Sequence, residues 1–444
     1  MEKFSRKNWM LLLLFGAIGQ IAWAVENMFF NLFVYQEVFS SLETVTLMVQ
    51  LSGITATVVT LIAGTLSDKV GNRKSFISYG YIIWGVTVAL FGCISPAAME
   101  KLFGLQGADA IKAALVLVVV GDCVMTLFGS SANDAAFNAW VTDTTKPEFR
   151  GRVESILSIL PLVSMLVVVG GFGTIADMLG SFRLVFMGLG LIIVACGFAG
   201  IFLFEDAPTL QKSGGFADII YGFRPSVIKK NAPFYVTLAA VAMFGIAVQV
   251  FMPYLIIFMS RVLSFDVLQY SAVFAIAILA GAGVNVYLGK VSDKMSKSRL
   301  LYLAAALLSA GLFVMYFASA ISVDKKLVLM LVFGFGGFVM ICGNIFSTAL
   351  TGSILRDNTP EGSAGKMQGV RMVASVLIPM LIGPSIGNSI NKFMAGGKEL
   401  EDAGTDILTT SYLPAREIFL VAAIASLVVL AIIPFITKAE RKSK

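Results

Sequence analysis

Long apolar stretches alternate with short polar ones along the whole chain. Each apolar run is about 20 residues or longer, which is enough to cross a hydrocarbon core of roughly 30 Å. Backbone N–H and C=O groups cannot stay unpaired in lipid, so we expect these runs to be helices. The pattern predicts twelve spans, numbered here in chain order, over residues 9–35, 45–66, 75–95, 112–141, 153–176, 182–205, 231–260, 268–290, 299–321, 326–352, 366–390 and 415–437.

Composition supports a membrane protein and excludes a soluble one of this length. Of the 444 residues, 57% are hydrophobic and 14% are charged, and the mean hydropathy is +0.87. Soluble domains carry about 25% charged residues, because they must cover their surface. We therefore predict an all-α membrane protein, and we expect the lipid bilayer to be its surrounding medium.

The net charge of +6 could suggest a nucleic-acid partner, but its distribution indicates otherwise. Most of the 33 Lys and Arg residues fall in loops on one side of the predicted membrane. This positive-inside pattern places both termini in the cytoplasm and leaves no reason to expect nucleic acid as a partner. The absence of an Asn-x-Ser/Thr sequence fits a plasma membrane of the bacterial inner type.

A long polar stretch divides the predicted spans into two sets of six. Residues 206–230 contain Pro208, Gly214, Gly215 and Pro225, which interrupt any continuous helix. We interpret this stretch as a cytoplasmic linker between two pseudo-symmetric six-helix bundles, residues 1–205 and 231–444. Two homologous halves with a site between them are a recurring transporter architecture.

A charged loop after span 2 recurs in weaker form after span 8. The first copy is Gly64-Thr65-Leu66-Ser67-Asp68-Lys69-Val70-Gly71-Asn72-Arg73-Lys74, and the second is Gly289-Lys290-Val291-Ser292-Asp293-Lys294. Together with the helix number and the central linker, this repeat resembles the loop signature of the major facilitator superfamily of transporters. The resemblance covers the whole chain. It implies that the loop holds the outward-open state and that spans 1, 4, 7 and 10 line a central cavity.

Charged residues at the ends of the spans are the candidates for gating. Asp68 can pair with loop arginines or with a helix N-terminus in one gate state only. A role in membrane topology alone remains the alternative for the basic residues of this loop. The predicted gating set is Asp68, Arg73, Lys74, Asp293, Arg150 and Arg371.

Polar residues inside the spans concentrate on spans 1, 4, 7 and 10. Such side chains are costly in a bilayer, so they mark candidate sites. In span 1, Gln20, Trp23, Asn27 and Asn31 recur at helical spacing and therefore share one face. The predicted substrate-binding set is Gln20, Trp23, Asn27, Asn31, Asp134, Asn138, Gln249, Tyr254 and Asn344.

Three acids inside the spans are candidates for binding a coupling ion. Glu26, Asp122 and Asp134 have no evident basic partner at the same depth. A carboxylate in such a cavity can exchange a proton or bind a cation, and the alternative is a structural hydrogen bond. Asp122 and Asp134 are separated by about 18 Å along a helix axis, so we do not expect one pocket to hold both.

Histidine and cysteine give no sign of a metal site or a cofactor. The chain has no histidine, so any proton coupling falls to carboxylates. The four cysteines lie within apolar spans without paired spacing and are expected to pack as small core residues. We therefore predict no metal site, no disulfide and no cofactor.

The segment Asp134-Ala135-Ala136-Phe137-Asn138 resembles span 4 of the glycoside–pentoside–hexuronide:cation symporters. The resemblance implies that the acid at Asp134 serves sugar and cation binding. The two span 2 acids of that family fall at Ala56 and Thr60 here, and its span 1 acid falls at Gln20. The amide-rich span 1 still suits a hydroxyl-bearing substrate, because amides donate and accept hydrogen bonds.

These observations predict a monomeric secondary transporter of a small-molecule substrate. The preferred function is uptake of a sugar or glycoside, coupled to a co-transported proton or sodium ion. The alternative is a proton-coupled exporter of drugs or other lipophilic small molecules. A membrane sensor is disfavoured by the intact gating loop. An enzyme is disfavoured because the sequence shows no nucleophile–base pair, metal cluster or phosphate-binding loop.

Overall fold

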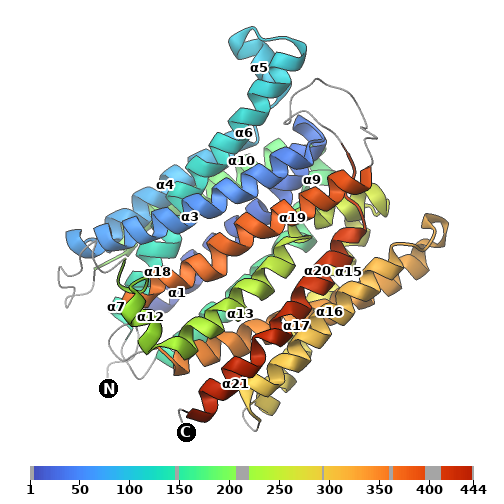
Figure 1. Cartoon of the computed structure of the whole chain (residues 1–444). Helices are drawn as coiled ribbons and strands as arrows, with labels where there is room; N and C mark the ends of the chain where they lie inside the picture. Colours follow the sequence, from blue (N-terminus) through green and yellow to red (C-terminus); the bar gives the residue numbers. More distant parts are fainter. Residues whose placement is uncertain are drawn as a thin grey trace. The chain divides into compact units, whose positions relative to one another are not determined.

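The computed structural model describes residues 5–145, 150–206, 220–292, 295–359, 364–395 and 412–442. These residues form helices joined by short turns, and no strand occurs among them (Figure 1). Within these ranges, twelve helical spans are long and apolar enough to cross a membrane. The predicted all-α membrane fold is confirmed.

The described chain divides into two compact units, 5–206 and 220–442, and each contains six of the spans. Most of the predicted linker, residues 207–219, lies outside the described residues, so its boundaries stay predictions.

In the first unit, several spans are built from consecutive helical segments that change pitch. Span 1 comprises α1 (Arg6–Val25), η1 (Glu26–Phe30), α2 (Asn31–Phe33) and η2 (Val34–Val38). Spans 2 and 3 are α3 (Leu42–Val70) and α4 (Arg73–Phe91). Span 4 comprises α6 (Gly107–Gly129), η3 (Ser130–Phe137) and α7 (Asn138–Thr144). Span 5 comprises α8 (Arg150–Val167), η5 (Val168–Phe172) and α9 (Gly173–Leu179), and span 6 is α10 (Phe182–Leu203).

The second unit begins with the short helix α12 (Pro225–Lys230) and repeats this composite construction. Span 7 comprises α13 (Ala232–Gln249), η6 (Met252–Tyr254), α14 (Leu255–Ile257) and η7 (Phe258–Val262). Spans 8 and 9 are α15 (Val267–Ser292) and α16 (Lys297–Ala318), and span 10 joins η8 (Val323–Lys325) to α17 (Lys326–Asp357). Span 11 comprises α18 (Ala364–Met372), η9 (Val373–Leu377) and α19 (Ile378–Ala395). Span 12 comprises α20 (Glu417–Leu427), η11 (Val428–Ala431) and α21 (Ile433–Lys442).

Two short helices were not predicted from the apolar pattern, and α12 is one of them, because it lies within the predicted linker. α5 (Pro96–Phe103) lies between spans 3 and 4, and it carries its own start and stop signals. The Ser95 side chain accepts a hydrogen bond from the backbone N–H of Ala98, Pro96 occupies the first turn, and Gly104 closes the helix with φ 67°. Capping of this kind is readable in a sequence, but a helix of eight residues is too short to register as a span.

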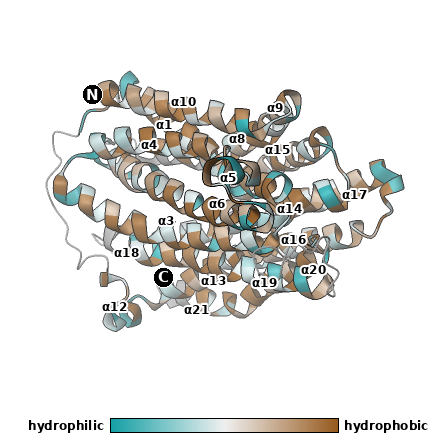
Figure 2. Ribbon diagram, turned by 90° about the horizontal axis from the view of Figure 1, so that it is seen from above, coloured by the Kyte–Doolittle hydropathy of each residue, from teal (hydrophilic) through white to brown (hydrophobic). Residues whose placement is uncertain are grey.

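Much of the helical ribbon in both units has the brown colour of hydrophobic residues (Figure 2). Many large ones are exposed, among them Leu191, Phe202 and Phe335. A soluble protein would bury such residues, whereas lipid is as apolar as the side chains themselves. These residues are therefore expected to face the bilayer.

Glycines let particular helices approach closely inside each unit. A Cβ atom added at Gly190 of α10 would lie 2.4 Å from the carbonyl oxygen of Gly85 on α4. In the second unit, a Cβ at Gly387 of α19 would lie 2.1 Å from the carbonyl oxygen of Val250. Small residues at such contacts bring the backbones of membrane helices together.

Candidate functional site

A buried polar cluster joins spans 1, 2 and 4 in the first unit. The hydroxyl of Ser52 on α3 lies 3.1 Å from Oε1 of Glu26 in η1. The hydroxyl of Thr126 on α6 donates to the same oxygen at 3.0 Å. The two hydroxyl oxygens are 2.8 Å apart, and either one can donate to the other. One carboxylate oxygen of Glu26 thus lies within hydrogen-bonding distance of two hydroxyl groups from neighbouring spans.

Asp122 lies one helical turn before Thr126 and belongs to the same cluster. Ser52 also interacts with the Asp122 carboxyl group, and the carboxyl groups of Glu26 and Asp122 interact electrostatically. Glu26 is 7% exposed and Asp122 is 2% exposed. Glu26 Oε2 and Asp122 Oδ1 are buried without a hydrogen-bond partner in the described part of the chain. Such a pair of buried acids requires a proton or a cation for compensation.

Asp134 forms a second polar group with a different set of neighbours. Its carboxylate accepts hydrogen bonds from the hydroxyl of Ser130 at 3.0 Å and from the amide of Asn133 at 3.3 Å. The side chain of Trp23 on α1 also hydrogen-bonds to this carboxylate. The Trp23 ring lies against that of Trp84, with centroids 5.1 Å apart. The structure therefore brings an aromatic ring and an acid together from spans 1 and 4.

Two of the three acids, one in each polar group, lie in π-helical segments. Glu26 begins η1 and Asp134 lies within η3. A π-helical turn widens the helix locally, and such turns occur frequently at functional sites. The hydropathy pattern gave no indication of them, because it does not distinguish a π-helical turn from an α-helical one.

The predicted amides of spans 1 and 4 bond mainly to their own helices. Asn27 and Asn31 donate to the carbonyl oxygens of Trp23 and Asn27, at 2.8 Å and 3.1 Å. Asn138 donates to the carbonyl oxygen of Asp134 at 3.1 Å. Asn27 and Asn138 are exposed, and Gln20 is half-buried.

In the second unit, the predicted residues lie on separate elements. Gln249 ends α13 and Asn344 lies on α17, and both are half-buried. Tyr254 is fully buried, and its hydroxyl donates to the carbonyl oxygen of Pro384 at 3.0 Å. That bond holds span 7 against span 11, so the hydroxyl already has a structural partner.

The second unit also contains a small apolar cavity with an empty volume of about 260 Å³. The side chains around it are aliphatic, aromatic or thioether groups. They include Leu255, Met259, Phe274, Met315, Phe333 and Met340.

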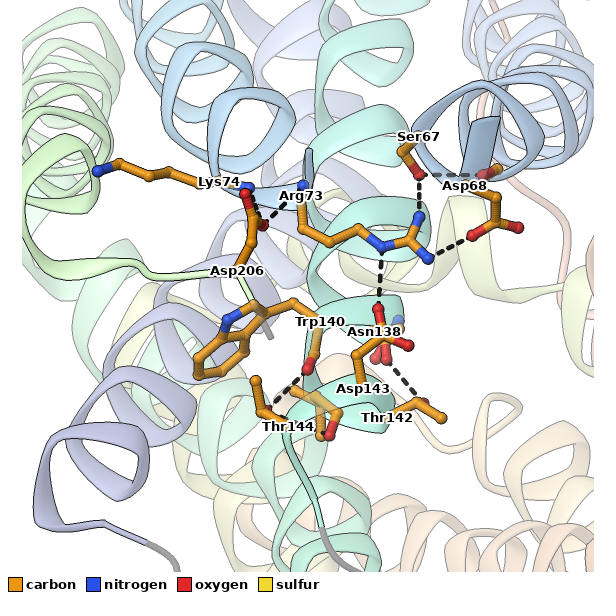
Figure 3. A network of polar contacts seen from close by, with 12 residues as sticks. Ser67, Asp68, Arg73, Lys74, Asn138, Trp140, Thr142, Asp143, Thr144 and Asp206 are labelled. Atoms are coloured by element: carbon orange, nitrogen blue, oxygen red, sulfur yellow. Dashed lines mark hydrogen bonds and ion pairs between the residues drawn. The ribbon is translucent and has the colours of Figure 1, made fainter. Parts of the chain in front are cut away.

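The loop between spans 2 and 3 forms a charged network around Arg73 (Figure 3). Arg73 is 4% exposed. Its guanidinium group donates to the hydroxyl of Ser67 and to the carboxylates of Asp68 and Asp143, with the Asp143 contact at 3.1 Å. Gly71 makes the turn possible with φ 69°, and Asn72 caps the N-terminus of α4.

The same network reaches the end of span 6. One carboxylate oxygen of Asp206 accepts from the backbone N–H groups of Arg73 and Lys74, at 2.8 Å and 3.0 Å. The indole of Trp140 donates to the carbonyl oxygen of Glu205 at 2.9 Å. Asp206 therefore places a negative charge at the positive N-terminus of α4. The side chain of Lys74 points away from this contact in Figure 3.

A nearby ion pair on the surface contributes little to the stability of the fold. Lys7 lies 2.5 Å from the carboxylate of Glu205, and this hydrogen bond lowers the pKa of Glu205. Both side chains are exposed, so solvent screening leaves the pair little stabilising effect.

The three other predicted gating residues, Asp293, Arg150 and Arg371, lie away from the loop between spans 2 and 3 in the sequence. Asp293 lies outside the described residues. Arg150 begins α8, and its side chain lies outside the described part of the chain. Arg371 lies on α18 and is half-buried, and its carbonyl oxygen accepts from the hydroxyl of Ser375 at 2.8 Å.

Residues 12–384 match the family model of the Major Facilitator Superfamily. The chain belongs to that superfamily. The superfamily and the solved neighbours are transporters rather than enzymes. Among curated proteins, none matches this sequence.

Three solved structures illustrate the likeness. A bacterial homologue of the human lysosomal transporter Spinster, inward-facing and unoccupied, has a TM-score of 0.68 at 12% identity, and the match covers 99% of both chains. The nucleoside transporter NupG has a TM-score of 0.67 at 11% identity, with 98% of this chain and 100% of the other covered. A D-xylose–proton symporter has a TM-score of 0.69 at 9% identity, with 96% and 97% covered. At these identities the likeness shows the fold of a superfamily transporter.

Proposed function

We propose that this superfamily member takes up a sugar or glycoside by alternating access, coupled to a proton or another cation. The observation that carries the substrate class is the contact between Trp23 and Asp134. An aromatic face packs against the apolar face of a sugar ring, and a carboxylate accepts hydrogen bonds from hydroxyl groups. The neighbouring amides Asn27 and Asn138 are exposed and can contribute further polar contacts.

The coupling role is assigned to the acids of spans 1 and 4. Glu26 and Asp122 are buried, and each has a carboxylate oxygen without a partner in the described chain. Acids placed in this way inside a membrane span are functional by default, because their burial is otherwise unfavourable. Asp134 belongs to the proposed substrate group, and it can respond both to the substrate and to the coupling cation.

The proposed location is the plasma membrane of a bacterium, with both termini in the cytoplasm and the chain acting as a monomer. The positive-inside distribution of Lys and Arg supports the orientation.

We also propose that the loop between spans 2 and 3 acts in gating, and the Arg73 network supports this role. The proposed gating residues of the loop are Asp68, Arg73 and Lys74. The further proposed gating residues are Arg150, Asp293 and Arg371.

The fold by itself does not choose the substrate. The structural neighbours are named for nucleosides, for D-xylose and for a lysosomal transporter, although all share one architecture. Function in such folds resides in the site. The proposal therefore depends on the residues around Trp23 and not on the neighbours.

Ligand-dependent thermal unfolding tests the substrate class directly. Purified protein is screened against sugars, glycosides, nucleosides and lipophilic cations. A ligand that binds the folded state raises its apparent stability with the logarithm of its concentration. We expect stabilisation by a sugar or glycoside, and we expect Trp23→Ala to remove it while Trp23→Tyr retains part of it. A sugar response that persists unchanged in Trp23→Ala would exclude this site.

A second candidate is proton-coupled export of drugs or other lipophilic molecules. The apolar cavity of the second unit favours it, because Met259, Met315 and Met340 offer an adaptable thioether surface. Stabilisation by lipophilic cations alone, abolished by enlarging Gly337 at the cavity wall, would support export over sugar uptake.

A further inference from the structure

Three oxygen atoms in the first unit form a compact triangle. They are Glu26 Oε1, Ser52 Oγ and Thr126 Oγ1, and the sides of the triangle are 3.1 Å, 3.0 Å and 2.8 Å. Two hydroxyl groups supply only two protons for these three contacts. When Glu26 is ionised, one side of the triangle therefore holds two oxygens close together with no proton between them.

Two further oxygens next to this triangle have no partner. Glu26 Oε2 and Asp122 Oδ1 are buried and accept no hydrogen bond from any described residue. Ser52 interacts with both carboxyl groups, so the two acids lie on either side of one hydroxyl. In the described chain, neither acid forms an ion pair with Lys or Arg. The cluster is thus rich in acceptors and poor in positive charge.

We propose that Glu26, Ser52, Asp122 and Thr126 bind one monovalent metal cation of the size of sodium. Carboxylate and hydroxyl oxygens are the ligands that hard cations select, at roughly 2.0 to 2.6 Å. A cation placed over a triangle with sides near 3 Å can reach all three oxygens within that range. The hydroxyl protons then rotate away from the ion, and its positive charge compensates the two buried carboxyl groups. This proposal rests on the proposed function, in which the cation would be the coupling ion.

A monovalent metal ion fits the cluster better than a divalent metal ion or a proton does. Two carboxylates that share a buried site repel each other, so one of them retains a proton and the pair carries one negative charge. Mg²⁺ keeps several water molecules in octahedral geometry, and Asp122 at 2% exposure leaves little room for them. One proton on the pair leaves that negative charge uncompensated, whereas a monovalent metal ion neutralises it. Cys123 and Asp134 are the other titratable groups whose charge reaches this pair.

The position of this cluster differs from the ion site that the symporter resemblance implied. Ala56 and Thr60 occupy the positions of the expected span 2 acids. Ser52 lies one turn before Ala56 on the same helix face, so an oxygen ligand is available there instead. Glu26 and Asp122 supply the carboxylates from spans 1 and 4.

The test measures binding of the metal alone to the purified full-length protein. Thermal unfolding is followed at pH 8 without sugar, in NaCl, KCl or N-methyl-D-glucamine chloride at equal ionic strength. We expect the unfolding temperature to rise by equal steps with each tenfold increase in sodium above its Kd. Glu26→Gln and Asp122→Asn should remove this rise, and Ser52→Ala and Thr126→Val should shift it to at least tenfold higher sodium.

One variant serves as the matched control for this titration. Ser131→Ala removes a hydroxyl from the same span, where Ser131 bonds only to its own helix at the carbonyl oxygen of Leu127. Ser131→Ala should keep the full sodium response. If Glu26→Gln does not fold, equilibrium binding of radioactive sodium to wild type and to Ser52→Ala provides the same comparison.

Several outcomes would overturn the proposal. These are equal stability in sodium and in N-methyl-D-glucamine, a sodium response that survives in Asp122→Asn, and stabilisation by Mg²⁺ or Ca²⁺ at lower concentration than sodium. Sodium binding without any sugar response would instead refute the proposed substrate class and leave the ion site standing. The two failures are therefore distinguishable.

Discussion

At the scale of single residues, the positions of buried charge matter most. Glu26, Asp122 and Arg73 are all buried, yet their surroundings differ. Arg73 has three side-chain acceptors around its guanidinium group, whereas each of the two acids keeps an oxygen without a partner. Pairing compensates the cost of burying Arg73, whereas the unpaired carboxylate oxygens need another partner, as expected of a binding site.

Replacement of Asp134 should separate coupling from exchange. In Asp134→Asn the side chain keeps its size and its hydrogen-bonding capacity but cannot exchange a proton or carry a charge. We expect accumulation of substrate against a gradient to be lost in proteoliposomes, while counterflow exchange persists. Unchanged concentrative uptake would show that Asp134 has no coupling role.

Replacement of Arg73 should destabilise the first unit. Arg73→Ala leaves Asp68 and Asp143 without their cation. Breaking a fully buried ion pair costs about 3–5 kcal/mol, and we expect a smaller loss here because Asp68 and Asp143 are partly exposed and solvent screens them. Arg73→Lys should recover only part of this, because an ammonium cannot bind three acceptors in a planar fork. The free energy of unfolding in denaturant measures both. Lys74→Ala is the control and should change it by less than about 0.5 kcal/mol, since the Lys74 side chain points away from the network.

The sequence indicated most of the candidate site residues, but it did not indicate which residues they contact. The acids of spans 1 and 4 stood out, because charge is rare in apolar spans. Ser52 did not, since it lies on span 2, where the family resemblance predicts no cavity lining. Asp206 was also missed as a partner of the gating loop, because a contact across 133 residues leaves no local signal.

At the scale of elements, helix ends and helix contacts decide the geometry. The predicted spans overlap the observed ones, since about 20 apolar residues define a span whatever its neighbours are. The π-helical turns and the short helix α5 were beyond this reasoning. They depend on local hydrogen bonds that the apolar pattern does not encode.

Removal of the Asp206 carboxylate from the N-terminus of α4 should loosen the gating loop. Asp206→Ala deletes an acceptor that serves two backbone N–H groups. Loss of a helix N-terminal cap costs about 0.5–2 kcal/mol. We expect faster hydrogen exchange at the backbone amides of Arg73 and Lys74. Asp206→Asn keeps an acceptor and should restore much of the protection, and equal exchange in all three proteins would contradict this role.

Helix packing in the first unit can be tested with a pair of glycines on α10. A Cβ at Gly190 would lie 2.4 Å from the carbonyl oxygen of Gly85, whereas a Cβ at Gly188 would have no atom within 4 Å. Gly190→Ala should therefore cost about 1–3 kcal/mol. Gly188→Ala should stabilise by up to about 1 kcal/mol, because alanine favours a helix. A similar unfolding temperature for both variants would refute the close contact.

At the scale of the whole molecule, the described residues place different chemistry in the two units. The buried acids and the charged network around Arg73 lie in the first unit, and the apolar cavity lies in the second. The second copy of the charged loop lies partly outside the described residues, so its similarity to the first stays a prediction. The fold alone does not assign function.

Membrane orientation can be tested by cysteine labelling in intact cells. A cysteine at Lys101, on α5 between spans 3 and 4, should react with a maleimide that cannot cross the membrane. A cysteine at Lys230, at the end of α12, should react only after permeabilisation, because the positive-inside pattern places it in the cytoplasm. The wild-type chain, with its four native cysteines, gives the background. The reverse labelling pattern would invert the proposed topology.

The π-helical turn at Glu26 has a consequence for how this transporter can diversify. Such a turn accommodates one extra residue while the helix on either side continues in its course. Deleting a single residue within Glu26–Phe30 would therefore return the segment to an α-helix and leave the flanking turns on their present faces. One codon gained or lost then exchanges which side chain faces the proposed ion site, with the rest of the span left in place.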